Sequence, residues 1–358
     1  MNIDELLRIV IEREASDLHL KVGSPPVLRI DGELVPYAYA DPIGLTSEDL
    51  KRAFDNITSE EQKERFAEEL ELDFAYSIPA FARFRVNAAL QRGTITLAFR
   101  RIAWNVPSIK ELGLPDICKA LVLKPRGCVI ITGPAGSGKS TTLAAMIEYL
   151  NERERRLVVT IEDPIEYLIR DRKCLITQRE LGTDTRSFAT ALKHALRQDP
   201  DVILVGEMRD LETIATALTA AETGHLVLST LHTPSAPQAI DRMIDVFPPH
   251  QQRQIRVQTS TTLQGVLYQT LLPVANGQGR VPAVEVMLAT PAIRNLIREG
   301  KVHQIPNIIQ TGAQYGMQTL NQALADLCQR GLVSREDALA RSSDPQELLT
   351  LMKVRRRR

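Results

Sequence analysis

Residues 131–142 read ITGPAGSGKSTT, and their types and spacing suit the binding of phosphate groups. The pattern G-x-x-x-x-G-K-[ST] after an apolar run and before a helical one is that of a P-loop, whose backbone N–H groups surround phosphate oxygens. The loop must be rich in glycine because side chains would block that approach. We predict that a nucleotide is bound by Gly133, Pro134, Ala135, Gly136, Ser137, Gly138, Lys139, Ser140 and Thr141.

Within this loop, individual side chains have separate expected roles. Lys139 should reach the β and γ phosphates, the Ser140 hydroxyl should bind Mg²⁺, and Thr141 should contact the α phosphate. Hydrolysis would further need an acid on the metal side and a residue that orients water.

The stretch DVILVGEMRD supplies the candidate for the metal side. An apolar strand leads to Gly206 and Glu207, at the carboxyl edge where ligands of open α/β sheets bind. Aspartate is more usual at this position, so we expect Glu207 to act at longer range, through a metal-bound water. The alternative is that Glu207 only favours the dipole of the next helix.

Two further stretches follow apolar strands in the same way. VVTIEDPIEY places Glu162, Asp163 and Glu166 where a triphosphate would repel them unless they hold metal or polarise water. GHLVLSTLHT places His225 and His232 at the two ends of another strand. We favour His232 as a sensor of the γ phosphate or a link between subunits, and a structural role stays open for both histidines.

The elements that must position these residues form two domains, for which 358 residues suffice. From about residue 114, apolar strands alternate with helices, which predicts a parallel sheet covered on both faces in a RecA-type or other P-loop α/β core. Residues 1–100 predict a small α+β domain with a hairpin turn at Asp31-Gly32 and helices that begin with capping boxes at Thr46–Asp49 and Thr58–Glu61. We place a linker at 101–113.

A later strand of the first domain carries a basic row. Alternation puts Phe84, Val86 and Ala88 on one face of the strand and Arg83, Arg85 and Asn87 on the other. Such a row needs an anion or acidic neighbours, and the alternative is a solvated face.

Composition limits the partners. Lys plus Arg and Asp plus Glu both number 44, so no overall field favours nucleic acid or a membrane. The four cysteines form no C-x-x-C pair, which argues against a zinc site or disulfides. No apolar run approaches ~20 residues, and the N-terminus is acidic where a secretory signal is basic. We expect a cytoplasmic protein with no transmembrane segment of its own and no nucleic-acid partner.

Taken together, four motifs resemble those of the secretion ATPase family that powers type II and type IV secretion and type IV pili. GPAGSGKSTT resembles its Walker A, TIEDPIEY its Asp box, DPDVILVGEMRD its Walker B with Glu in place of Asp, and TGHLVLSTLHT its His box. ASDLHL, RIDGEL and RFRVN in the first domain fit as well, so the resemblance covers nearly the whole chain. The chain is short and has no tetracysteine site, as in the motors that retract type IV pili.

The resemblance implies a fold and a set of roles. The fold is a RecA-like core, 114–358 with a C-terminal helical segment, joined to a smaller PAS-like domain in a homohexamer that hydrolyses ATP with Mg²⁺. Glu166 would activate water, Glu207 would lie on the Mg²⁺ side, and the domains would close on each other. Arg85 and Arg100 would reach the nucleotide, with Arg83 as a further candidate.

Partners are implied in the same way. They are an inner-membrane pilus platform protein, with other pilus ATPases as further candidates, at the cytoplasmic side of the pilus base. PAIRNLIREGK, residues 291–301, resembles a segment associated with retraction motors. The purely structural alternative is an amphipathic helix that packs on Ile293, Leu296 and Ile297, with Arg294 and Arg298 solvated. The terminal KVRRRR predicts a solvated end, with weak attachment to anionic lipid as the alternative.

Competing functions stay open at this point. They are an accessory retraction paralogue, a RecA-like nucleic-acid translocase, and a nucleotide-gated scaffold without hydrolysis. A translocase should show a basic or aromatic track for strands, whereas aromatic residues make up only 4% of this chain. DNA-stimulated ATP hydrolysis at low salt would favour the translocase, and multiple-turnover phosphate release would exclude the scaffold.

Overall fold

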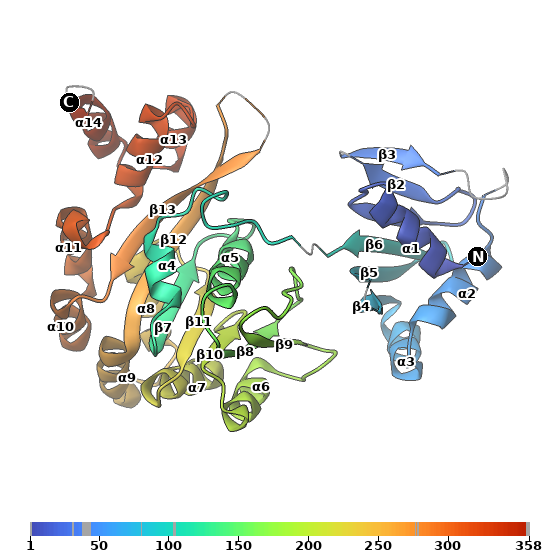
Figure 1. Ribbon diagram of the computed structural model, residues 1–358, viewed down its shortest axis with the longest axis horizontal. Coiled ribbons are helices and arrows are strands. Elements are labelled where there is room, and N and C mark those ends of the chain that lie inside the picture. The colour runs from blue at the N-terminus through green and yellow to red at the C-terminus, as the bar shows by residue number, and fades with distance from the viewer. Residues whose placement is uncertain are drawn as a thin grey trace. The chain divides into compact units, whose positions relative to one another are not determined.

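The computed structural model describes residues 2–30, 32–37, 44–79, 81–102, 105–275, 277 and 279–355. The chain divides into two compact units, Met1–Trp104 and Asn105–Arg358 (Figure 1). Asp31 of the predicted turn, residues 103 and 104 of the predicted linker and residues 356–358 of the basic tail lie outside the described residues. Within the described ranges, no helix is both long enough and apolar enough to cross a membrane.

The first unit is a six-stranded antiparallel sheet in the order β3-β2-β1-β6-β5-β4, packed against three helices (Figure 1). On β5, Phe84, Val86 and Ala88 are buried and Arg85 and Asn87 are exposed, which confirms the predicted alternation. The elements are α1 (Ile3–Glu12), β1 (Asp17–Leu20), β2 (Val27–Ile30), β3 (Glu33–Pro36), α2 (Ser47–Ile57), α3 (Glu60–Glu69), β4 (Glu71–Ile78), β5 (Ala82–Gln91) and β6 (Thr94–Arg101).

One of the two predicted capping boxes is displaced by a residue. The box at Thr46–Asp49 is confirmed. The second box joins Ser59 and Gln62, so the prediction of Thr58 and Glu61 was wrong. The reason is that the Thr58 hydroxyl donates to the carbonyl of Phe54 at 2.6 Å and closes the preceding helix instead.

The second unit contains a seven-stranded sheet in the order β13-β12-β7-β11-β10-β8-β9. Adjacent strands are parallel from β12 to β9, but β13 is antiparallel to β12. The sheet is therefore mixed, and the prediction of a parallel sheet was wrong at this edge. A short turn between consecutive strands allows only antiparallel pairing. The strands are β7 (Gly127–Thr132), β8 (Leu157–Glu162), β9 (Leu175–Glu180), β10 (Val202–Val205), β11 (Leu226–Leu231), β12 (Leu263–Pro273) and β13 (Arg280–Leu288).

Helices cover both faces of this sheet, as predicted. One face packs on α4 (Ile117–Val122) and α5 (Lys139–Asn151). The other packs on α6 (Phe188–Ala195), α7 (Leu211–Glu222), α8 (Ala236–Asp245), α9 (Pro249–Thr262), α10 (Pro291–Glu299) and α11 (Ile305–Thr311). A separate apolar cluster joins the β12–β13 hairpin to α12 (Leu320–Gln329), α13 (Arg335–Arg341) and α14 (Pro345–Arg355).

Helix α10 corresponds to the predicted helix in PAIRNLIREGK. Ile293 and Ile297 are buried on its inner face, and Arg298 is exposed, as predicted. Arg294 is not solvated, which corrects the prediction. Its guanidinium donates to the carbonyls of Ala289, Ser260 and Thr261 at 2.8, 2.6 and 2.7 Å. The last two are free carbonyls at the C-terminal end of α9, which attract a cation.

Candidate nucleotide site

The glycines of the loop after β7 have backbone conformations that other residues rarely adopt, and one of them makes a contact that only glycine allows. Gly133, Gly136 and Gly138 have φ values of +147°, +72° and +85°. A Cβ atom on Gly133 would lie 2.2 Å from the carbonyl oxygen of Gln269 on β12, so only glycine fits there. The loop therefore passes close to the neighbouring strand before α5 begins at Lys139.

The side chain of Lys139 is folded into the loop. It is 8% exposed, and its Nζ atom donates to the carbonyls of Gly133 and Pro134 at 2.9 and 3.0 Å. Burial lowers the pKa of Lys139, while the charges of Glu207 and Glu166 act in the opposite direction. The ammonium group thus lies at the centre of the loop, within the field of two carboxylates.

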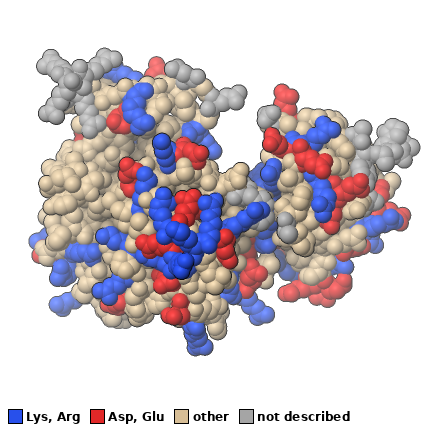
Figure 2. Space-filling view, viewed as in Figure 1, with Lys and Arg blue, Asp and Glu red and all other residues tan. Residues whose placement is uncertain are grey.

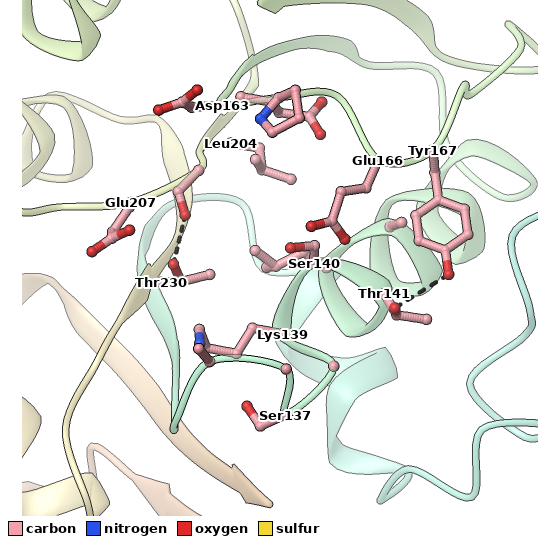
Figure 3. Close-up of a pocket in the computed structure, with 18 of the residues that line it drawn as sticks. Ser137, Lys139, Ser140, Thr141, Asp163, Glu166, Tyr167, Leu204, Glu207 and Thr230 are labelled. Atoms are coloured by element: carbon pink, nitrogen blue, oxygen red, sulfur yellow. Dashed lines mark hydrogen bonds between the residues drawn. The ribbon is translucent and has the colours of Figure 1, made fainter. Parts of the chain in front are cut away.

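A cavity of about 450 Å³ brings together the loop and three other predicted groups (Figure 3). Glu166, Glu207 and His232 line it, although they follow three different strands. Figure 3 shows Glu166 extending from its segment into the cavity. The loop contributes Ala135, Gly136, Ser137, Gly138, Lys139, Ser140 and Thr141.

Glu207 is held by two neighbours. Arg209 Nε donates to one carboxylate oxygen at 2.7 Å, and His232 Nε2 lies 3.4 Å from the other. Burial alone would raise the pKa of Glu207, but Arg209 and His232 outweigh it and hold the pKa below its usual value. The hydroxyl of Thr230 donates to the carbonyl of Gly206 at 2.6 Å, which fixes the backbone just before Glu207 (Figure 3). Glu207 is therefore an ionised, oriented carboxylate.

The three acids at the end of β8 and just after it differ in environment. Glu162, the last residue of β8, is partly buried, and its carboxylate accepts hydrogen bonds from Thr160 at 2.6 Å and Gln178 at 3.1 Å. Burial raises the pKa of Glu162 despite these bonds. Asp163 and Glu166 are exposed. Both exposed acids line the cavity, and Figure 3 shows the side chain of Glu166 extending into it. Glu166 thus has the solvent access and the orientation that a residue that handles water requires.

Two oxygen-bearing groups in the cavity suit Mg²⁺. Among the described residues, no cluster of three or more His, Cys, Asp or Glu side chains could hold a metal ion. Ser140 and Glu207 both line the cavity, one with a hydroxyl and the other with an ionised carboxylate. Mg²⁺ commonly takes one or two protein oxygens together with substrate phosphates and water. The residues present thus fit this ion.

His225 does not line the cavity, and the two arginines belong to the first unit. His225 Nδ1 lies 3.0 Å from the carbonyl of Ala220, at the end of α7, and is absent from the cavity lining. Arg85 and Arg100 belong to the first unit, and their acidic neighbours there are Asp73 at 4.0 Å and Asp17 at 2.9 Å. On the face shown in Figure 2, basic side chains lie among acidic ones on both units.

Several lining or supporting residues were not predicted. Tyr167 forms a 3.2 Å hydrogen bond with Thr141, as Figure 3 shows, and Arg280 reaches the cavity from β13. Arg209 was part of a quoted motif but had no predicted role. Gln269 touches the loop from β12. The sequence signal for Gln269 and Arg280 is weak because they lie more than a hundred residues from the loop, in no motif of their own.

Comparison with known proteins gives a consistent result. The family described as type II/IV secretion system protein matches residues 83–340. The type IV pilus retraction ATPase PilT of Pseudomonas aeruginosa is 50% identical, over 97% of this chain and 99% of that protein. The type IV pilus ATPase PilU of the same organism is 42% identical, over 99% of this chain and 92% of that protein.

A solved structure agrees over nearly the whole chain. The crystal structure of the pilus retraction motor PilT with bound ADP has a TM-score of 0.88 and 46% identity, and the match covers 98% of this chain and 99% of that one. The family match covers more than half of this chain. The two relatives align with it over more than nine-tenths of their own length. The chain therefore belongs to the type II/IV secretion system protein family.

Proposed function

We propose that the chain is an ATPase motor that drives retraction of type IV pili, and hence twitching motility. The observation that carries this proposal is the 50% identity to PilT over nearly the full length of both chains. The cavity supports it, since the P-loop, Glu166, Glu207 and His232 line one space.

In the proposed reaction, ATP is the substrate and its phosphates lie in the P-loop. Backbone N–H groups and Lys139 hold them, and Ser137 offers a buried hydroxyl that has no hydrogen-bond partner among the described residues. Ser140 and Glu207 would hold Mg²⁺, which when bound neutralises charge on the phosphates. Glu166 accepts a proton from the attacking water, and His232 senses the γ phosphate beside Glu207.

The proposed architecture is a RecA-like core and a PAS-like first domain that close on each other within a homohexamer. The order β12-β7-β11-β10-β8, with the P-loop strand between β12 and β11, supports a RecA-like core. In this proposal Arg85 and Arg100 exchange their present acidic neighbours for nucleotide phosphates when the domains close. In the same proposal, the first domain is 1–100, the linker is 101–113 and the core is 114–358.

The proposed partner is an inner-membrane platform protein at the cytoplasmic side of the pilus base. Binding of ATP would favour the closed state of the domains, because the closed and open states bind ATP with different affinity. Closure would then move the partner. A second candidate function is that of an accessory retraction ATPase, and the 42% identity to PilU favours it.

Deletion and complementation distinguish the two candidates. The gene is deleted in its host, and labelled pili are followed by fluorescence microscopy in strains that carry the wild-type chain, Lys139→Ala or Lys173→Ala. Lys173 is an exposed control whose Nζ donates to the carbonyl of Arg153. Retraction should be lost on deletion and restored by the wild type and Lys173→Ala only. Retraction that persists after deletion would contradict the primary motor and favour the accessory role.

A further inference from the structure

Gln269 is a buried amide that touches the P-loop from outside the cavity. It is 3% exposed and does not line the cavity. On β12 it follows Tyr268, which pairs with Thr132 at the end of β7. Gln269 therefore lies beside the first residues of the loop that continues from β7.

The contacts of Gln269 span both ends of the loop. Its backbone carbonyl is the atom that a Cβ on Gly133 would meet at 2.2 Å, and its Nε2 would lie 2.9 Å from a Cβ on Gly138. Nε2 donates to the Ser137 carbonyl at 2.7 Å, and Oε1 accepts from the Thr142 hydroxyl at 2.8 Å. Because a carbonyl can only accept, the amide nitrogen must be the end that faces Ser137.

The bond to Ser137 fixes the direction of a peptide group. The Ser137–Gly138 peptide is trans, so its C=O and N–H point in opposite directions. With the carbonyl turned toward Gln269, the N–H of Gly138 is turned away from β12, on the side where Ser137 and Gly138 line the cavity. A backbone N–H that faces this cavity is a donor to phosphate oxygens.

We propose that Gln269 is a positioning residue for nucleotide binding: it holds the Ser137–Gly138 peptide so that the Gly138 N–H faces the phosphates. The inference rests on the proposed ATPase function and adds a residue to it. Gln269 touches no reacting atom, so it sets the affinity for nucleotide and not the chemical step.

A binding measurement on the full chain tests this role. Gln269→Met keeps the length of the side chain and removes both hydrogen bonds. The Kd for a fluorescent ADP analogue should rise about 10-fold, as loss of a buried hydrogen bond predicts, while kcat at saturating ATP should stay within about 2-fold. The matched control is Gln264→Met on the same strand. Gln264 Nε2 donates to the carbonyl of Arg126 at 3.1 Å, before β7 and away from the loop, so Kd should not change.

A second variant provides a measurement, the pH dependence of ADP affinity, that a loss of packing alone would not change. In Gln269→Glu, an ionised carboxylate would face the Ser137 carbonyl and repel it, whereas a protonated carboxyl can donate to it. Burial raises the pKa of such a group. The loss of affinity should therefore be largest at pH 8 and should shrink toward pH 6, relative to the wild type at each pH.

Unchanged ADP affinity in Gln269→Met would overturn the inference, as would a loss in Gln269→Glu that does not depend on pH. If the methionine variant does not fold, as thermal unfolding would show, the pH response of the glutamate variant decides. Failure of the wild-type chain to bind ADP at all would instead refute the proposed ATPase function.

Discussion

The Nε2 atom of His232 lies 3.4 Å from Oε2 of Glu207, so residues that follow two neighbouring parallel strands meet at one carboxylate. The other oxygen of Glu207 is bound by Arg209 at 2.7 Å. The site thus contains one permanent cation and one imidazole on the same acid. In the proposed mechanism, the imidazole is the group that senses the γ phosphate.

His232→Ala should lower ATP turnover about 100-fold, the usual cost of removing one polar group that acts on developing charge. ADP affinity should change little, because Lys139 and the loop remain. His225→Ala is the matched control at the other end of β11, where the ring contacts the carbonyl of Ala220. Steady-state phosphate release of both variants checks this prediction. Equal rates in the two variants would remove His232 from the mechanism.

Gly133→Ala should destabilise the chain far more than Gly136→Ala. Gly136 has a φ of +72°, close to the left-handed region, where a side chain costs about 1–2 kcal/mol. Gly133 has a φ of +147°, outside that region, where side chains are rarer still. Only Gly133 adds a clash, since its Cβ would lie 2.2 Å from the Gln269 carbonyl, whereas a Cβ on Gly136 meets nothing within 4 Å. Urea unfolding without nucleotide measures the difference. Similar losses in the two variants would show that the close approach of β12 is not a constraint.

Glu162 should make stability depend on pH with a defined sign. Burial raises its pKa above the usual 4.5, so the folded state binds the proton more tightly than the unfolded state does. Its contribution is fully present below pH 4.5 and is lost as pH rises through the raised value. Glu162→Gln should therefore lose less stability than the wild type between pH 5 and pH 8. Asp163→Asn, at the exposed neighbour, should follow the wild-type profile, and a Glu162→Gln profile equal to both would contradict the assignment.

Arg294→Ala should destabilise the second unit, while Arg298→Ala should not. Arg294 donates to two carbonyls at the end of α9, and Arg298 on the same helix is exposed. Loss of charged hydrogen bonds to these carbonyls costs about 2–3 kcal/mol. Thermal unfolding of the two variants measures this cost. Equal melting temperatures would mean that Arg294 does not stabilise α9.

Much of this fold could be predicted because short sequence patterns specify the same local structure that the fold contains. The P-loop has a fixed spacing between a buried strand and a helix, and β5 alternates cleanly between buried and exposed residues. The predictions were wrong where a contact outside the quoted motif decided the outcome. The pattern around Arg294 predicts a solvated arginine, but its guanidinium binds carbonyls of α9. The pattern around Thr58 predicts a helix cap, but its hydroxyl donates to the preceding turn.

The candidate site shows the same division. Lys139, Glu166, Glu207 and His232 each follow a strand, and the carboxyl ends of parallel strands meet at one edge of a sheet. Gln269 could not be found in this way because its role depends on the register of β12 against β7. Register is a property of paired strands, and a single strand in the sequence does not reveal it.

The variant Glu166→Gln tests the proposed ATP hydrolysis most directly. In the proposed mechanism, Glu166 activates the attacking water in a site that binds ATP through other residues. Steady-state phosphate release and binding of a fluorescent ATP analogue are measured on the purified wild-type chain and the variant. The variant should bind the analogue as tightly as the wild type and release phosphate at least about 100-fold more slowly. Wild-type turnover in Glu166→Gln with intact binding would contradict the proposed mechanism.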